Sequence, residues 1–259
     1  MPHMEEIIKE NLKAIEQEMN VNILYAAESG SRAWGVASPD SDYDVRFVYV
    51  RNIEEYLRLD PLRDVIEWCL DEVLDINGWD LKKALLGVKK SNPNLLEWVN
   101  SPIVYKQHAA WPAIRDQALA YASEKSLVCH YYGVAFSTYM EHLRGDKVRY
   151  KKYIYALRPL LCCLYVEHFH KPPVVEFHQL LMSLQEILPD DLIEAINSML
   201  AIKVQHGEHD VLPSIPILQN FIAQECQRQK TMSEQLPVDH KRDYEPLNEV
   251  FLKLVKGQM

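Results

Sequence analysis

Two aspartates near the start of the chain have the residue type and spacing of a metal-binding pair. Asp42 and Asp44 are two residues apart at the head of the β-branched and aromatic run from Tyr43 to Val50. Because side chains alternate faces along a strand, both carboxylates are expected to point the same way. Carboxylates this close repel each other unless a cation neutralises them, and oxygen ligands favour Mg²⁺ or Mn²⁺. Taken alone, the pattern also fits a solvated acidic turn.

A Gly-Ser pair shortly before these aspartates adds the features of a phosphate site. Gly30 and Ser31 follow the buried run from Val21 to Ala27, which predicts a strand. Glycine lets backbone N–H groups approach an anion closely, and a helix beginning there would add its positive end. The Ser31 hydroxyl can bond a phosphate oxygen. The two motifs together therefore predict a phosphate-binding turn, called the phosphate cradle below, beside a pair of metal-binding carboxylates.

The order strand, Gly-Ser, short helix, loop and Asp-x-Asp strand resembles the DNA polymerase β-like nucleotidyltransferase superfamily. Longer stretches resemble the bacterial predicted nucleotidyltransferases of the YcgL type, relatives of the RNA ligase-associated group RlaP: GSRAWGVASPDSDYDVRFVYV, LDINGWDLKKAL, SNPNLLEWVNSPIVY and KKYIYALRPLL. The resemblance extends to about Gln185. It implies transfer of a nucleoside monophosphate from an NTP to a hydroxyl on an RNA end, a protein or a small molecule, with pyrophosphate release and two Mg²⁺ or Mn²⁺ ions as cofactors.

The superfamily also implies a third carboxylate on a neighbouring strand. Asp75, within Val73-Leu74-Asp75-Ile76, fits this position, and Asp80 is the rival. Asp80 precedes Leu81-Lys82-Lys83-Ala84, where capping a helix is its expected role. Asp42, Asp44 and Asp75 are thus the expected metal ligands and catalytic residues, with Asp75 on the ion that lowers the pKa of the acceptor hydroxyl.

Further cations are candidates for holding the nucleotide. Gly30, Ser31 and Arg32 are expected to bind the β and γ phosphates, although an ion pair of Arg32 with Asp40 or Glu28 is an equal alternative.

A second candidate surface lies in the later, helical half. Lys147, Lys151, Tyr155 and Arg158 are spaced to share one helical face, which would bind the triphosphate tail and stack a base on Tyr155. A solvated helix face is the alternative, and function is favoured for Lys151 and Arg158.

Hydrophobic periodicity predicts an α+β fold. Residues 1–105 are expected to form a domain with a mixed β-sheet, and residues 106–259 an α-helical domain. The family resemblance implies that the first is the nucleotidyltransferase domain and that the second closes the nucleotide cleft. The first domain is expected to hold a helix over 4–19 and strands over 21–27, 43–50, 65–70 and 72–76, with turns at Asp71 and Asn77-Gly78. Later helices are expected over 93–99, 112–124, 126–143, 148–168, 176–187, 190–202, 216–233 and 244–255.

Composition narrows the partners and the location. The net charge of -9, from 28 basic and 37 acidic residues, disfavours long duplexes as acceptors and favours an RNA end or a small acceptor. The five cysteines are scattered and are expected to be reduced core residues. Neither a signal peptide nor a membrane span is evident, so a cytoplasmic location without a membrane partner is expected. The oligomeric state stays open. The alternative function is a non-catalytic, antitoxin-like module that binds a nucleotide to regulate a partner.

Overall fold

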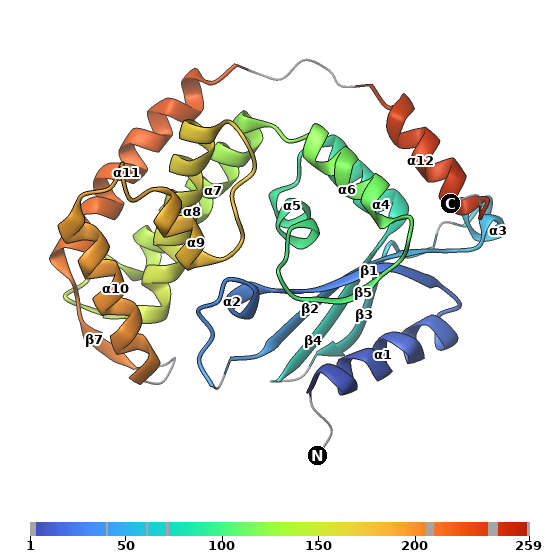
Figure 1. The fold of residues 1–259 in the computed structure, drawn as a ribbon, viewed down its shortest axis with the longest axis horizontal. Coiled ribbons are helices and arrows are strands. Elements are labelled where there is room, and N and C mark those ends of the chain that lie inside the picture. Colours follow the sequence, from blue (N-terminus) through green and yellow to red (C-terminus); the bar gives the residue numbers. More distant parts are fainter. Residues whose placement is uncertain are drawn as a thin grey trace. The chain divides into compact units, whose positions relative to one another are not determined.

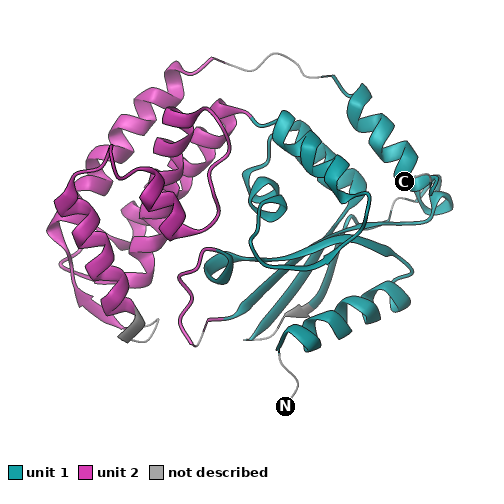
Figure 2. Cartoon of the chain, in the orientation of Figure 1, with its two compact units in different colours: residues 1–33, 42–122, 241–259 teal, residues 34–41, 123–240 magenta. Residues whose placement is uncertain are grey.

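The computed structural model describes residues 4–39, 41–60, 62–70, 73–205, 210–237 and 243–257. The chain divides into two compact units, each built from separate stretches of sequence (Figure 2). Unit 1 comprises Met1–Ala33, Asp42–Ala122 and Lys241–Met259, and unit 2 comprises Trp34–Ser41 and Ser123–His240. The division therefore falls after Ala122 and not after residue 105, and the C-terminal residues belong with the first unit.

Unit 1 contains a five-stranded sheet in the order β3-β4-β2-β1-β5 (Figure 1). Its strands are β1 (Asn22–Ser29), β2 (Tyr43–Val50), β3 (Val65–Leu70), β4 (Leu74–Asp80) and β5 (Val104–Gln107). β2 pairs with β4 in parallel and the other pairs are antiparallel, which confirms the predicted α+β class with a mixed sheet.

Two local predictions in unit 1 were wrong. The Asn77-Gly78 pair is no turn but lies inside β4, where a Cβ on Gly78 would stand 2.1 Å from the Phe47 ring. Glycine is needed there for this close packing, not for a bend. The short edge strand β5, which pairs with β1, was not predicted, because four residues show too little alternation. The expected turn at Asp71 lies outside the described residues.

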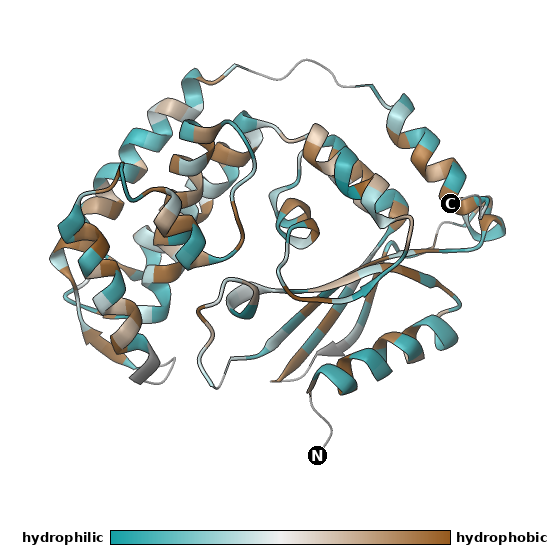
Figure 3. Ribbon diagram, viewed as in Figure 1, coloured by the Kyte–Doolittle hydropathy of each residue, from teal (hydrophilic) through white to brown (hydrophobic). Residues whose placement is uncertain are grey.

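Helices cover both faces of the sheet (Figure 1). α1 (Met4–Glu18) places Ile8, Leu12 and Ile15 in one core with residues of the sheet that include Val45 and Ile76, and its outer side is hydrophilic (Figure 3). The opposite face is covered by α4 (Leu81–Lys89) and α5 (Pro93–Val99), on which α6 (Trp111–Ala120) packs. Unit 1 also contains the helices α2 (Gly30–Ala33), α3 (Ile53–Tyr56) and α12 (Glu245–Val255).

Unit 2 is mainly helical and is centred on α8. It contains α7 (Glu124–His142), β6 (Lys147–Arg149), α8 (Tyr150–Phe169), α9 (Phe177–Ser183), α10 (Asp190–Gln205), β7 (Val211–Pro213) and α11 (Pro216–Gln235). Leu157, Leu160, Leu161 and Leu164 of α8 are buried. Lys147 lies in β6, which pairs with β7, so it does not share the α8 helical face on which it was expected.

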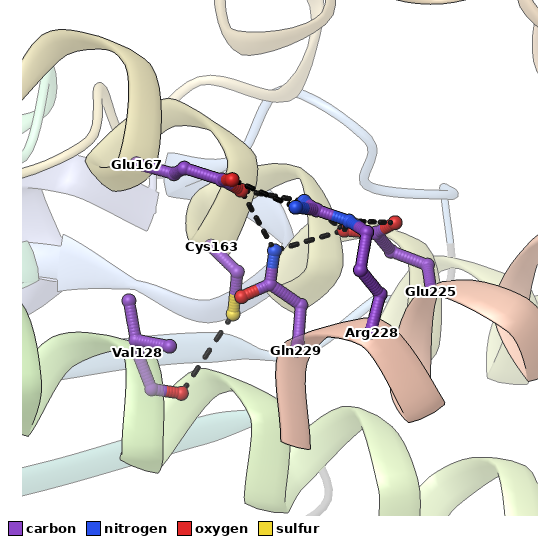
Figure 4. Close-up of polar contacts among 6 residues, drawn as sticks. All are labelled: Val128, Cys163, Glu167, Glu225, Arg228 and Gln229. Carbon is purple, nitrogen blue, oxygen red and sulfur yellow. Dashed lines mark hydrogen bonds and ion pairs between the residues drawn. The ribbon is translucent and has the colours of Figure 1, made fainter. Parts of the chain in front are cut away.

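A polar network joins α8 to α11 inside unit 2 (Figure 4). The Arg228 guanidinium donates to Glu167, with Nη1 2.7 Å from Oε1, and to Glu225, with Nη2 2.7 Å from Oε1. The hydrogen bond from Arg228 lowers the pKa of Glu167. Gln229 is fully buried and donates to both carboxylates.

The cysteines follow the prediction only in part. Cys162, Cys163 and Cys226 are buried thiols, and burial raises the pKa of the Cys163 thiol. Cys129 is also a thiol but is exposed, which differs from the prediction, because it lies on the outer side of α7. The Cys69 side chain lies outside what the structure describes.

The connection between the two sequence motifs belongs to the helical unit. Trp34 O accepts a hydrogen bond from Phe177 N at 2.8 Å, and Val36 O accepts one from Lys203 Nζ at 2.6 Å. Lys203 is 5% exposed, and Gly35 has a φ of +72° against the Glu176 side chain. Unit 2 therefore holds the loop that separates the Gly-Ser pair from the Asp-x-Asp pair.

Candidate functional site

Two of the predicted carboxylates are brought together by strand register. β2 and β4 run in parallel, and Asp44 is paired with Asp75. Because Val45 and Ile76 face α1, alternation places Asp44 and Asp75 on the opposite face of the sheet. Both side chains are partly buried, at 25% and 27% exposure.

A cation that was not singled out from the sequence joins these carboxylates. Arg46 Nη2 lies 2.8 Å from Asp44 Oδ1 and 2.7 Å from Asp75 Oδ2, and Nη1 lies 3.2 Å from the Asp75 backbone O. The sequence held a signal for this contact, since Arg46 is two residues after Asp44 and therefore shares its face.

The Gly-Ser motif touches the same pair. Ser29, at the end of β1, is paired with Asp44, and Gly30 follows with a φ of +62°. A Cβ on Gly30 would lie 2.2 Å from Asp44 Oδ2, so the missing side chain is what allows the carboxylate to rest against this turn. α2 is only four residues long, and Ser31 is half-buried in it. The predicted cradle and the predicted carboxylate pair are thus in direct contact.

Glu28 is buried and contacts Asp44, a role that was not predicted from the sequence. It is 1% exposed, accepts from Asp44 N at 2.7 Å and receives a hydrogen bond from the Tyr105 hydroxyl. Its own backbone N–H donates to Ile103 O, and its carbonyl accepts from Ser101 Oγ at 2.6 Å. Burial raises the pKa of the Glu28 carboxyl. No local pattern could reveal these partners, because they come from the segment around β5.

Asp42 and Arg32 lie beside this pair at the entrance to β2. Asp42 directly precedes the strand and is exposed. Its backbone O accepts from Arg32 Nε at 2.9 Å, while the Arg32 guanidinium stacks on the Tyr43 ring at 3.6 Å. Of the two alternative ion-pair partners of Arg32, Asp40 lies outside the described residues. For the other, Glu28, burial is the largest effect and raises the pKa, whereas the positive charge of Arg32 acts in the opposite direction. The hydrogen bond and the stacking contact hold Arg32 against Asp42 and Tyr43 of the Asp-x-Asp segment.

Asp80 caps a helix, as predicted. Its Oδ1 accepts from Lys82 N at 2.8 Å at the start of α4, and its Oδ2 accepts from the Tyr56 hydroxyl at 2.9 Å. Burial raises the pKa of Asp80. Asp75, the other candidate, is the residue that is paired with Asp44.

The nucleotide-binding candidates of α8 lie in unit 2, and one of them is buried. Arg158 is 2% exposed, donates to Val175 O at 3.0 Å from Nη2, and stacks on the Trp34 ring at 4.4 Å. The Nζ atom of Lys151 lies 6.0 Å from the Tyr155 ring centroid, and Tyr155 meets Trp34 edge to face. Arg158 therefore packs inside unit 2 against Trp34 and Val175, which differs from its expected place on an accessible, nucleotide-binding helical face.

The carboxylate oxygens of Asp44 and Asp75 suit a hard divalent ion, but these two residues alone do not fill its coordination shell. Asp75 Oδ1 is buried and, among the described residues, has no hydrogen-bond partner. Asp44 and Asp75 offer only oxygens, as Mg²⁺ and Mn²⁺ prefer. Among the residues that the structure describes, no three His, Cys, Asp or Glu side chains are grouped to hold a metal. A bound ion would thus complete its shell with Asp42, water or the phosphates of a substrate.

Comparison with known proteins identifies the family. The family model described as "RNA repair pathway DNA polymerase beta family", RlaP, matches residues 4–253. The chain belongs to this family. It is 39% identical over 255 residues to a Bacillus subtilis (strain 168) protein described as "Uncharacterized protein YcgL", covering 98% of this chain and 97% of that protein. The RlaP match and the polymerase β relationship indicate a nucleotidyltransferase-like protein.

One solved structure is a more distant match. It is described as a nucleotidyltransferase-like protein from Exiguobacterium sibiricum 255-15. The two chains are 14% identical, the match covers 96% of this chain and 89% of that chain, and the TM-score is 0.29. Among the described residues of the RlaP-family chain, no helix is long and apolar enough to cross a membrane.

Proposed function

We propose that this chain transfers a nucleoside monophosphate from an NTP to a hydroxyl acceptor and releases pyrophosphate. The observation that carries the proposal is the in-register pair of Asp44 and Asp75 resting against Gly30, in a chain of the polymerase β-related RlaP family. The acceptor that fits best is an RNA end, in keeping with the family description. A net charge of -9 suits a short terminus better than a long duplex.

Asp44 and Asp75, with Asp42, would hold Mg²⁺ or Mn²⁺. When bound, such an ion polarises the phosphate and lowers the pKa of the acceptor hydroxyl. This ligand role is supported by Asp75 Oδ1, which is buried and has no hydrogen-bond partner in the part of the chain that the structure describes.

The other residues of the site bind and orient the substrate. The Gly30 and Ser31 backbone, the Ser31 hydroxyl and the Arg32 guanidinium would hold the β and γ phosphates, and Arg32 would balance the charge of the departing pyrophosphate. The acceptor oxygen forms its bond to the α-phosphorus as the bond to the pyrophosphate oxygen breaks. For unit 2 we make a separate proposal, that Lys151 binds a phosphate group and that Tyr155 stacks on a base.

The proposal is tested with each α-labelled NTP, Mg²⁺ or Mn²⁺, and a panel of acceptors that includes RNA with a free 3′-hydroxyl, the protein itself and small alcohols. Pyrophosphate release and transfer of label are measured together. The Asp42→Asn, Asp44→Asn double variant should lose both signals by a factor of at least about 10³, since carboxylates that hold the catalytic ion contribute several kcal/mol.

Asp80→Asn is the matched control for this experiment. It changes an acid on the same strand as Asp75, and asparagine can still cap α4. Activity should persist in Asp80→Asn and vanish in Asp75→Asn. Equal label transfer by wild type and the double variant on every acceptor would reject the catalytic proposal. Nucleotide binding without transfer would favour the regulatory alternative.

A further inference from the structure

The Arg46 guanidinium occupies the space between the two carboxylates that are in register. Its Nη2 contacts one oxygen of Asp44 and one of Asp75, at 2.8 and 2.7 Å. Its side chain is 19% exposed, so these contacts are shielded from most of the solvent. A guanidinium is a planar fork of fixed charge, and it therefore holds two carboxylates at a defined separation.

A second set of contacts fixes the guanidinium in place. Nη1 donates to the carbonyl oxygens of Val45 and Asp75, at 3.1 and 3.2 Å. The arginine is thus tied to the backbone of both strands as well as to both carboxylates. It stabilises the parallel β2–β4 pair at the point where two negative charges face each other.

The two carboxylate oxygens that Arg46 contacts, Asp44 Oδ1 and Asp75 Oδ2, are also ligands that a divalent ion can use. An ion that bridges these two oxygens would replace the Arg46 contacts. Asp75 Oδ1 has no hydrogen-bond partner among the described residues, so an ion could contact Asp75 there before it displaces Arg46.

We propose that Arg46 is a positioning residue that competes with the divalent ion for Asp44 and Asp75. Weak binding of the free ion is the consequence, and tight binding requires the extra oxygen ligands and negative charge of the NTP phosphates. The protein would then take up its metal together with the nucleotide. This inference rests on the proposed function and adds that the site binds its metal ion tightly only when the nucleotide is also bound.

The test compares Mn²⁺ binding to wild type, Arg46→Met and Arg46→Gln, measured by the electron paramagnetic resonance signal of the free ion. The neutral variants should bind Mn²⁺ in the absence of nucleotide about tenfold more tightly than wild type, because a unit charge a few ångströms from a divalent ion is strongly felt even near a protein surface. A non-hydrolysable NTP analogue should tighten binding by a large factor in wild type and by a smaller one in the variants.

Arg63→Met is the matched control. It removes the same charge from unit 1 at a side chain that is 68% exposed and pairs only with Glu67 among the ion pairs of the described residues, so Mn²⁺ affinity should stay at the wild-type value. Arg46→Gln keeps hydrogen-bond donors and guards against failure of Arg46→Met to fold, which circular dichroism would reveal.

The outcomes separate the two claims. If Mn²⁺ binds wild type through Asp75, as shown by its loss in Asp75→Asn, and neither neutral Arg46 variant binds more tightly, the competition is refuted and the metal site stands. If neither wild type nor the variants bind Mn²⁺ with or without nucleotide, the proposed function fails and the inference fails with it. A merely structural role for Arg46 predicts weaker binding in both variants, which also overturns the proposal.

Discussion

Replacing Gly30 with alanine tests the contact between the Gly-Ser turn and the carboxylate pair. Gly30 has a φ of +62°, where an alanine costs about 1 kcal/mol relative to glycine. The added Cβ would also stand 2.2 Å from Asp44 Oδ2, so the Asp44 side chain must turn away and loosen its bond to Arg46. Loss of that partly exposed, charge-assisted bond adds roughly 1 to 2 kcal/mol. The free energy of unfolding of unit 1 should therefore fall by roughly 2 to 3 kcal/mol.

The assay is urea denaturation followed by circular dichroism, with Mn²⁺ binding measured on the same samples. Gly257→Ala is the matched control, because Gly257 also has a positive φ, of +63°, in unit 1 and has no heavy atom within 4 Å of the added Cβ. The difference between the two variants isolates the Asp44 contact. If Gly30→Ala cost no more than Gly257→Ala and left Mn²⁺ binding unchanged, Asp44 would not rest against the turn and the described site geometry would be refuted.

Two further predictions concern unit 2. Arg158→Ala should destabilise unit 2 by about 2 to 3 kcal/mol, since it leaves the Val175 carbonyl without its buried donor and removes the cation from the Trp34 ring, whereas Lys151→Ala should change stability by about 0.5 kcal/mol or less. Thermal melts of both variants check this, and equal small losses would contradict the structural role of Arg158. Glu167→Gln should lower stability at pH 7 by about 1 kcal/mol or less, and the difference from wild type should disappear in acid. Its sign follows from the pKa of Glu167, which Arg228 lowers from the ordinary value of 4.5: the stabilisation is present above that value and is lost as the pH falls through the folded-state pKa. A difference that persisted unchanged to pH 3 in denaturant titrations would contradict it.

Local patterns in the sequence were sufficient for the parts of the site that lie within single elements. The run from Tyr43 to Val50 forms β2 with the predicted bounds, because β-branched and aromatic residues dominate it. Asp80 caps α4 because the preference of aspartate for that position acts over only a few residues. The spacing of Gly30, Asp44 and Asp75 was likewise visible in the chain.

Contacts between distant segments were decided only by the tertiary structure. Glu28 is buried beneath Asp44 because β5 brings Tyr105 beside it, and a glutamate in a turn-like sequence gives no sign of such a partner. Arg158 was expected on a nucleotide-binding helical face, because helical periodicity does not reveal that Val175 and Trp34 cover it.

Arg46 shows where the two sources of information meet. Alternation along β2 places Arg46 on the face of Asp44, and this much follows from the sequence alone. That Arg46 also reaches Asp75 depends on the parallel register of β2 and β4, which side-chain packing across the whole sheet selects. The sequence thus determined the residues and their faces, and only the tertiary structure determined that a guanidinium lies between the two carboxylates, because strand pairing is a long-range property of the chain.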